Sequence, residues 1–192
     1  MLLVQLLVDP WFWAFLAATG WALAFGLVGT ESLGRRLSFG IFMFTLAELP
    51  RVLLPLPFVN QPRLTPIPTW LVVLGALILV TSLYFGTPVF RIIPLTGPDR
   101  QEPLRTDGLY ARVRHPLMLC DIFWPLGWSL IFGSLIGMAL TPLWLLIIWA
   151  LTHVEEQSLV REYGEAYRQY QSQVPRLLPG FHTPSKKHIT GS

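Results

Sequence analysis

Charged residues are scarce in this chain of 192 residues, where Asp, Glu, Lys and Arg together make up 13% of the sequence. A soluble domain carries about 25% charged residues, so the shortage argues against a soluble globular protein. The mean hydropathy is +0.52, and long uncharged tracts alternate with short charged segments. The composition therefore predicts an integral membrane protein.

Cysteine is nearly absent as well, because Cys120 is the only one. One cysteine excludes an intramolecular disulfide and a cysteine-based metal cluster. The sequence lacks G-x-G-x-x-G, Walker, H-E-x-x-H and G-x-S-x-G motifs, and neither His115 nor His153 has ligand spacing with another His or Cys. The basic residues behind the net charge of +3 flank apolar tracts, which favours membrane lipids as partners. We expect no bound metal and no nucleic acid.

Four apolar tracts are long enough to cross a bilayer, whose core of roughly 30 Å requires about 20 helical residues. The first three are Pro10–Thr30, Leu37–Asn60 and Leu64–Phe90. The fourth, Pro116–Thr152, is too long for one helix and suits two helices joined by a tight turn near Gly133–Gly137. The sequence therefore predicts an all-α membrane protein with about five transmembrane helices, the last two forming a hairpin.

The pattern changes after the fifth predicted span, where His153–Ser172 is largely polar. Apolar residues recur there at spacings of three and four, which predicts an amphipathic helix on the membrane surface. We expect one domain over residues 1–184, followed by a tail at 185–192. Within it, three helices occupy residues 1–90, and a catalytic loop, the hairpin and the C-terminal helix occupy residues 91–180.

Basic residues are divided unequally between the two sides of the predicted bundle. Twelve of the fourteen lie in loops and the C-terminal segment on one side, Arg63 lies on the other side, and Arg51 falls within a span. Cytoplasmic loops carry an excess of Lys and Arg. The sequence therefore predicts an N-terminus outside the cell and a catalytic loop and C-terminus in the cytoplasm.

Three ionisable residues fall inside predicted spans, where charge is costly and side chains face a cavity or each other. Glu48 and Arg51 are three residues apart on one helix, so a self-contained pair is the simplest account. Asp121 has no local partner, and it either lines a cavity or is protonated.

The segment richest in chemistry is Glu102–Met118, "EPLRTDGLYARVRHPLM". Pro116 suits the first turn of a helix, which places Arg114 and His115 at a helix N-terminus on the membrane surface. Such a site favours an anion, and an arginine adds a bidentate partner for a carboxylate. The alternative is that Arg112 and Arg114 only anchor the helix in headgroups while His115 caps it.

A second charged pair, Glu155–Glu156, ends the fifth predicted span. Carboxylates at a helix C-terminus are unfavourable and require a compensating partner. The hairpin brings this pair beside Arg114 and His115, so we expect the two groups to lie close together. The alternative is a solvated boundary that only marks where the span stops.

The segment "TDGLYARVRHPLM", a helical hairpin, and then "EEQSLVREYGEAYRQYQSQVPRLLP" follow in order. This arrangement resembles the isoprenylcysteine carboxyl methyltransferase and phospholipid methyltransferase superfamily of integral membrane methyltransferases. The shared pattern is G-x-Y-x-x-x-R-H-P, the hairpin, E-E-x-x-L, G-x-x-Y-x-x-Y and V-P-R-x-x-P, over residues 102–180. Two positions depart from it: Met118 stands where the family usually has Tyr, and Leu151 stands where isoprenylcysteine enzymes have Arg.

The resemblance implies S-adenosylmethionine as methyl donor, bound without a Rossmann fold. The cofactor-binding residues that it implies are Glu102, Leu104, Arg105, Tyr110, His115, Pro116, Leu117, Met118 and Glu155. The catalytic residues expected are Arg114, His115 and Glu156, and His115, Glu156 or Asp121 would accept a proton if the acceptor must lose one.

The expected reaction is methyl transfer to a lipophilic acceptor that enters from the bilayer, of the isoprenylcysteine carboxylate or phospholipid amine class. An alternative is a non-catalytic membrane scaffold or lipid-binding protein of the same fold. A sterol-type reductase with a nicotinamide cofactor has a related hairpin, but such enzymes are larger than 192 residues.

Overall fold

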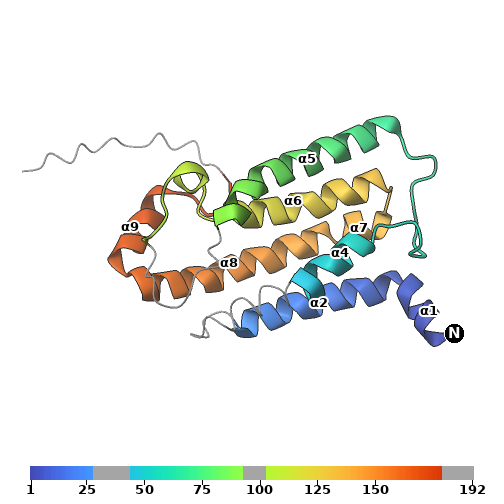
Figure 1. Cartoon of the computed structure of the whole chain (residues 1–192), viewed down its shortest axis with the longest axis horizontal. Helices are drawn as coiled ribbons and strands as arrows, with labels where there is room; N and C mark the ends of the chain where they lie inside the picture. The colour runs from blue at the N-terminus through green and yellow to red at the C-terminus, as the bar shows by residue number, and fades with distance from the viewer. Residues whose placement is uncertain (28–43, 93–102, 179–192) are drawn as a thin grey trace, which may run out of the picture.

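A computed structural model of the chain describes residues 1–27, 44–92 and 103–178, and these residues form helices and loops without β-strands. The long helices lie side by side along the long axis of the molecule (Figure 1). The predicted all-α architecture is confirmed over the described residues. The helices are α1 (Leu2–Val8), α2 (Pro10–Leu27), the π-helical η1 (Phe44–Glu48), α4 (Leu49–Leu53), α5 (Thr69–Ile92), the 3₁₀-helical η2 (Gly108–Ala111), α6 (Pro116–Ile131), α7 (Leu135–Ala139), α8 (Thr141–Tyr163) and α9 (Glu165–Gln173).

The predicted membrane spans are reproduced only in part. Within the described residues, α5 alone contains a single-helix span, Thr69–Thr87, that is long and apolar enough to cross a bilayer. The helices α1 and α2 satisfy the same criterion only as a pair bent by 75°. Because α6 has 16 residues and a perpendicular span needs about 20, five transmembrane helices remain a prediction.

The second predicted span, Leu37–Asn60, is not one continuous α-helix where it is described. Its first residues lie outside the described ranges, and its helical part ends with α4 at Leu53. Pro55 and Pro57 follow, and proline disrupts the backbone hydrogen bonding of a helix interior. The chain therefore turns at this point instead of continuing as a helix to Asn60.

The predicted hairpin is present as α6, the short helix α7, and α8. Gly133 forms the turn with φ of 60°, a left-handed conformation that favours glycine. The hydroxyl of Ser134 then caps α7 by accepting a hydrogen bond from the backbone N–H of Gly137 at 3.0 Å. The start of α6 and the far end of α8 consequently lie toward the same end of the bundle (Figure 1).

The amphipathic helix predicted over His153–Ser172 is wrong in its boundaries. Helix α8 continues without a break through Tyr163, and a separate helix, α9, begins at Glu165. Gly164 separates them with φ of 59° and ψ of −126°, a conformation that essentially only glycine adopts. This break folds α9 back so that Tyr167 and Tyr170 are buried.

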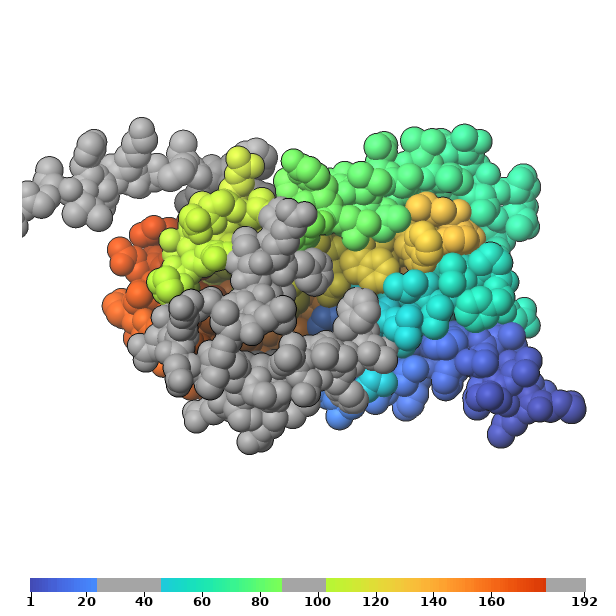
Figure 2. Space-filling view, viewed as in Figure 1, coloured from blue at the N-terminus to red at the C-terminus, as the bar shows by residue number. Residues whose placement is uncertain are grey.

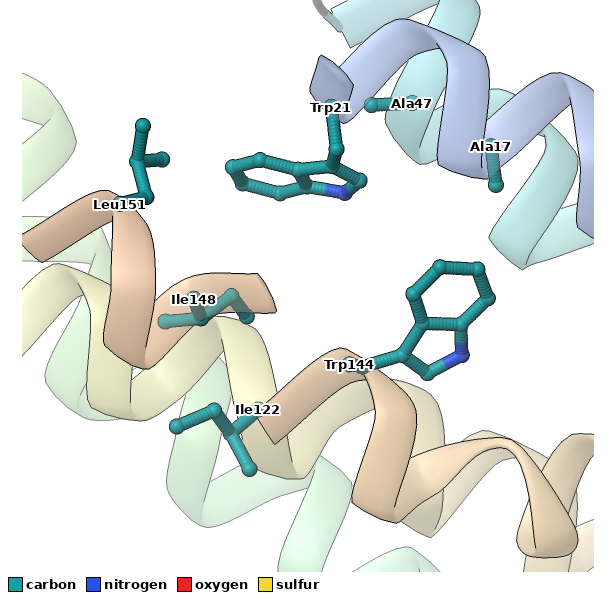
Figure 3. Packing of buried hydrophobic residues seen from close by; sticks show 7 residues of the cluster. All are labelled: Ala17, Trp21, Ala47, Ile122, Trp144, Ile148 and Leu151. Atoms are coloured by element: carbon teal, nitrogen blue, oxygen red, sulfur yellow. The ribbon is translucent and has the colours of Figure 1, made fainter. Parts of the chain in front are cut away.

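The hydrophobic core lies between α2, α6 and α8. Figure 3 shows Trp21 of α2 and Trp144 of α8 directed into the same interior, with Ile148 and Leu151 beside them. On the other side of α6, Gly75 and Gly127 bring α5 and α6 into close contact, since a Cβ atom on either would lie 2.6 Å from the carbonyl oxygen of the other. Small residues permit such close approach between membrane helices.

A buried ionic network connects α4 to α6, and it revises the expectation for Asp121. Arg51 is 2% exposed. Its Nη1 lies 2.7 Å from Glu48 Oε1 and 3.5 Å from Asp121 Oδ1, so the Glu48–Arg51 pair is not self-contained. Arg51 Nη2 also donates to the backbone carbonyl of Asp121 at 2.5 Å. This carbonyl needs an outside donor because the helical partner four residues later is Pro125, which has no N–H.

Candidate active site

The loop before α6 is held against α9 at one end of the molecule. Figure 2 shows the yellow-green loop residues beside the orange-red α9. The hydroxyl of Tyr170 on α9 donates to the carbonyl of Tyr110 at 2.6 Å. Gly108, with φ of 59°, permits the turn that begins the 3₁₀ helix containing Tyr110. The loop therefore presents the residues before α6 to the C-terminal helix.

The residues after α9 fix the start of α6 through backbone hydrogen bonds. The N–H of Arg114 donates to the carbonyl of Pro175 at 2.9 Å, and the N–H of His115 donates to the carbonyl of Arg176 at 3.1 Å. His115 is the N-cap residue of α6, but its side chain makes no capping hydrogen bond. Its imidazole is directed instead toward α8.

The imidazole of His115 lies between two carboxylates. Its Nδ1 is 3.2 Å from Glu155 Oε2, and its Nε2 is 3.2 Å from Glu156 Oε1. Burial alone would lower the pKa of His115, but the interactions of both ring nitrogens with Glu155 and Glu156 outweigh it and raise the pKa above its ordinary value. The site therefore favours a protonated, positively charged His115.

Glu156 is the centre of the cluster and is 3% exposed. Arg114 Nη2 lies 3.3 Å from its Oε1, and Arg176 Nη2 lies 2.5 Å from its Oε2. Gln171 Nε2 also donates to Oε2 at 3.2 Å. Burial raises the pKa of Glu156, but its bonds to His115 and Arg176 and the nearby arginine charges prevail and lower the pKa to about 2. Glu156 is a paired anion, so a solvated boundary does not describe it.

Three polar atoms in this cluster are buried without a hydrogen-bond partner among the described residues. They are Oε2 of Glu155, Nε of Arg114 and Nε of Arg176. Glu155 Oε2 forms an ion pair with His115 Nδ1 at 3.2 Å. Buried polar atoms are nearly always hydrogen-bonded, so the guanidinium Nε atoms left without hydrogen bonds beside the Glu155 carboxylate indicate a place for a polar ligand.

The structure brings together four residues expected at the site, Arg114, His115, Glu155 and Glu156. The other expected residues are arranged around them in the loop and at the start of α6. Pro116, Leu117 and Met118 form the first turn of α6, Tyr110 lies in the 3₁₀ helix, Leu104 and Arg105 lie in the loop before it, and Glu102 is outside the described residues.

Three residues in contact with the cluster or with the loop before it were not predicted as site residues: Gln171 and Arg176, which contact Glu156, and Tyr170, which contacts Tyr110. Arg176 had a signal, because it is the arginine of the V-P-R-x-x-P stretch that carries part of the family resemblance. Gln171 had no such signal, because the sequence of a polar helix does not distinguish a glutamine that contacts the site from one that faces solvent.

The two departures from the family pattern both face the protein interior. Leu151 is 5% exposed and belongs to the core cluster with Trp21 and Trp144, and Met118 packs against the same cluster. No guanidinium is therefore available at position 151 for a substrate carboxylate.

Comparison with known proteins gives a consistent result. The sequence profile of the family described as phospholipid methyltransferase matches residues 68–166. Among curated relatives, protein-S-isoprenylcysteine O-methyltransferase of Schizosaccharomyces pombe is 33% identical over 94 residues, covering 47% of this chain and 39% of that protein. The Homo sapiens protein of the same name is 28% identical over 123 residues, covering 58% and 42%. Methanethiol S-methyltransferase of Crocosphaera subtropica is 31% identical over 121 residues, covering 57% and 43%. Each match covers less than half of the relative's length.

Proposed function

This chain belongs to the phospholipid methyltransferase family, and on that premise we propose that it is a membrane methyltransferase that uses S-adenosylmethionine to methylate a lipophilic acceptor. The observation that carries the proposal is the charged cluster at the open end of the α6–α8 hairpin. This cluster buries atoms of Glu155 and Arg114 that have no hydrogen bond to the described residues. The two relatives with different names, an O-methyltransferase and an S-methyltransferase, support the same class of reaction.

The residues of the cluster fit the polar groups of S-adenosylmethionine. The donor's carboxylate matches Arg114 and the first N–H groups of α6, those of Leu117 and Met118, which have no partner within the helix. Its ammonium or ribose hydroxyl groups match the carboxylate of Glu155, whose side chain is 40% exposed. The aromatic ring of Tyr110 is suited to a sulfonium. Three chemically different groups of the donor thus have complementary partners within one short region.

When bound, S-adenosylmethionine supplies a methyl group on a sulfonium, which is transferred by in-line displacement. The protein contributes by holding both reactants in line, an effect that lowers such a barrier by about 7–11 kcal/mol. In this role Glu156 and Arg176 fix His115 and Arg114, and these in turn define the donor's position. Excluding water also favours a reaction in which the sulfonium charge is lost.

The geometry bears on the choice of acceptor, because each residue expected to take up a proton is already engaged. His115 faces carboxylates with both ring nitrogens, Glu156 is paired with arginines, and Asp121 is bound to Arg51 and to Trp124. An acceptor that is already anionic, such as a carboxylate or thiolate, needs no base. A phospholipid amine would require one, so we favour the anionic classes.

We place this end of the bundle at the cytoplasmic surface, because the sequence gathers its basic residues there and the polar donor is a soluble metabolite. The acceptor would then approach from the bilayer.

The test is donor binding by the detergent-purified protein, measured by isothermal titration calorimetry with S-adenosylmethionine. We expect saturable binding that is lost in the double variant His115→Ala, Glu155→Ala and retained in Glu162→Ala, which removes an exposed carboxylate from the same helix. A protein without saturable binding, or with unchanged binding in the double variant, contradicts the proposal. Donor binding without a methylated product across carboxylate, thiol and amine lipids would favour the non-catalytic alternative.

A further inference from the structure

A cavity outside the charged cluster lies between α5 and α6. Its volume is about 510 Å³, within the range of roughly 300–1,000 Å³ that is usual for small-molecule sites. Its walls are almost entirely apolar and include Leu77 and Phe85 of α5 and Cys120 and Phe123 of α6. We call this cavity the α5–α6 groove. A hydrocarbon chain is the ligand that matches such walls.

The groove lies along the face of α5 that is open to the surroundings. Leu77 is 61% exposed and Phe85 is 44% exposed, and both belong to the segment Thr69–Thr87 that is apolar enough to span a bilayer. In a membrane these side chains meet lipid rather than water. The acyl chain of a neighbouring lipid can therefore enter the groove sideways without crossing a polar barrier.

One charged side chain, Arg112, stands at the groove's loop end. Arg112 is exposed, and among the described residues no carboxylate forms an ion pair with it. The position is next to the end of the spanning segment, where lipid headgroups lie. A cation above an apolar groove complements an amphiphile with an anionic head and a hydrocarbon tail.

The groove and the charged cluster use different faces of one loop. Leu109, Val113 and Pro116 line the groove. Arg114 and His115, which lie between them in the sequence, bind Glu156 of α8 and the residues after α9. An occupant of the groove therefore touches the back of the segment that carries the proposed donor site, and the loop backbone separates it from that site.

We propose that the α5–α6 groove binds one anionic phospholipid as a permanent ligand that is not the methyl acceptor. One acyl chain lies between Leu77, Phe85 and Cys120, and the phosphate pairs with Arg112. The bound lipid supports Leu109, Val113 and Pro116 from behind, and so holds Arg114 and His115 where the donor requires them. The single arginine makes the groove prefer an anionic lipid over a zwitterionic one. A basic residue near the membrane surface raises the affinity for an anionic lipid by about fivefold.

Because Cys120 is the only cysteine in the chain and lines the groove, its alkylation reports occupancy directly. The full chain is reconstituted in nanodiscs of phosphatidylcholine alone or with added phosphatidylglycerol, and a membrane-permeant maleimide is added without S-adenosylmethionine. We expect phosphatidylglycerol to slow alkylation of Cys120 by about fivefold. Equal rates in the two lipid compositions would overturn the proposal.

Two pairs of variants assign the effect to the groove. Arg112→Gln should abolish the difference in the Cys120 alkylation rate between the two lipid compositions. Arg161→Gln, which removes an exposed arginine of α8, should keep it.

Thr81→Trp fills the groove from α5 and should prevent retention of phosphatidylglycerol in native mass spectrometry. Val80→Trp places the same bulk on the neighbouring residue, which is 64% exposed and not part of the groove wall, and should retain the lipid. Protection that persists in Arg112→Gln contradicts the anionic-head assignment.

The lipid's role behind the donor loop is tested by measuring donor affinity in both lipid compositions. Phosphatidylglycerol should tighten S-adenosylmethionine binding in the wild type and not in Arg112→Gln, because linkage between two sites is reciprocal. Native mass spectrometry after incubation with S-adenosylmethionine shows whether the retained lipid is a permanent ligand or the methyl acceptor. A retained lipid that gains the mass of a methyl group would show that the groove is the acceptor site and overturn this proposal. Alkylation and lipid retention need no turnover, so they stand apart from the proposed function.

Discussion

Two clusters in this protein bury ionic side chains, and they differ in how completely the surrounding side chains enclose them. Around Arg51, in the interior of the bundle, the guanidinium binds Glu48, Asp121 and a helix carbonyl. The rings of Trp21, Trp124 and Trp144 also surround its Cζ at 5.4–5.8 Å from their centroids. Both clusters contain buried atoms without a hydrogen bond to described residues, namely Arg51 Nε and Trp21 Nε1 in the first and Glu155 Oε2, Arg114 Nε and Arg176 Nε in the second. The His115 cluster lies at the end of the bundle, however, and its Glu155 side chain is 40% exposed.

The difference separates a structural network from a candidate binding site. Arg51 compensates for Pro125, whose missing N–H leaves the carbonyl of Asp121 without a helical partner, and the surrounding indole rings close the remaining space. The His115 cluster is also held by Glu156, but it is open to the surroundings on the side of Glu155, whose side chain is 40% exposed. Buried charge alone therefore does not identify a site, whereas buried charge beside an accessible carboxylate does.

The largest effect should come from breaking the closed network. Arg51→Met leaves the carboxylate and the carbonyl of Asp121 without their partner, and removing one member of a buried ion pair costs about 3–5 kcal/mol. We expect a large fall in the unfolding temperature in detergent, with donor affinity unchanged in the protein that remains folded. If donor binding weakened while the unfolding temperature stayed the same, the Arg51 cluster would be a binding site and not a structural network.

A double-mutant cycle sharpens this prediction. Pro125→Ala restores a backbone N–H for the carbonyl of Asp121, so Arg51→Met should cost less in that background than in the wild type. A coupling energy near zero between Arg51→Met and Pro125→Ala would mean that Arg51 does not stabilise the protein by replacing the hydrogen bond that Pro125 lacks.

The next largest effect should come from the open cluster. Glu155→Gln keeps the size of the side chain and removes its charge. A hydrogen bond to a charged group contributes about 1.5–3 kcal/mol, so we expect S-adenosylmethionine affinity to fall by at least about tenfold. The unfolding temperature should fall only slightly, because the side chain of Glu155 is 40% exposed and exposed ion pairs contribute little. Titration calorimetry and thermal unfolding on the same preparation check both halves, with Glu162→Gln as the matched control.

Sequence periodicity and motifs were sufficient for the hairpin and its neighbouring charges, because both depend on local signals. Gly133 and the apolar tracts on either side of it indicate a turn, and the turn brings Arg114 and His115 to Glu155 and Glu156. The predicted boundary between α8 and α9 was wrong because the sequence does not show that Gly164 has a positive φ and therefore breaks the helix. Apolar spacing continues across it without interruption.

The network around Arg51 was predicted only in part because it joins segments that are distant in the sequence. The spacing of Glu48 and Arg51 indicated their pair, but nothing local connects Arg51 to Asp121, which lies 70 residues later. Pro125 was a usable signal, since a proline inside a helix leaves a carbonyl that requires a donor. The partner that supplies this donor can be found only from the packing of α4 against α6.

The pH dependence of stability should report the His115 cluster. The pKa of His115 is raised above its ordinary value of 6.5, so its contribution is complete below that value and is lost as the pH rises through the folded-state pKa. The pKa of Glu156 is lowered from 4.5 to about 2, so its contribution is complete above 4.5 and is lost as the pH falls toward 2. Unfolding temperatures should therefore be highest between these limits. His115→Asn should flatten the alkaline side.

The smallest effect should come from the contact that ties α9 to the loop of the open cluster. Tyr170→Phe removes the hydroxyl that donates to the carbonyl of Tyr110, and a hydrogen bond of this kind contributes about 1 kcal/mol. We expect the unfolding temperature to fall by about 2–4 °C and donor affinity to fall slightly, because the loop before Arg114 becomes less fixed. The exposed variant Gln169→Glu on the same helix serves as the control. A Tyr170→Phe protein that loses donor binding entirely would mean that α9 belongs to the binding site itself, and the open cluster would then extend from α8 to the hydroxyl of Tyr170.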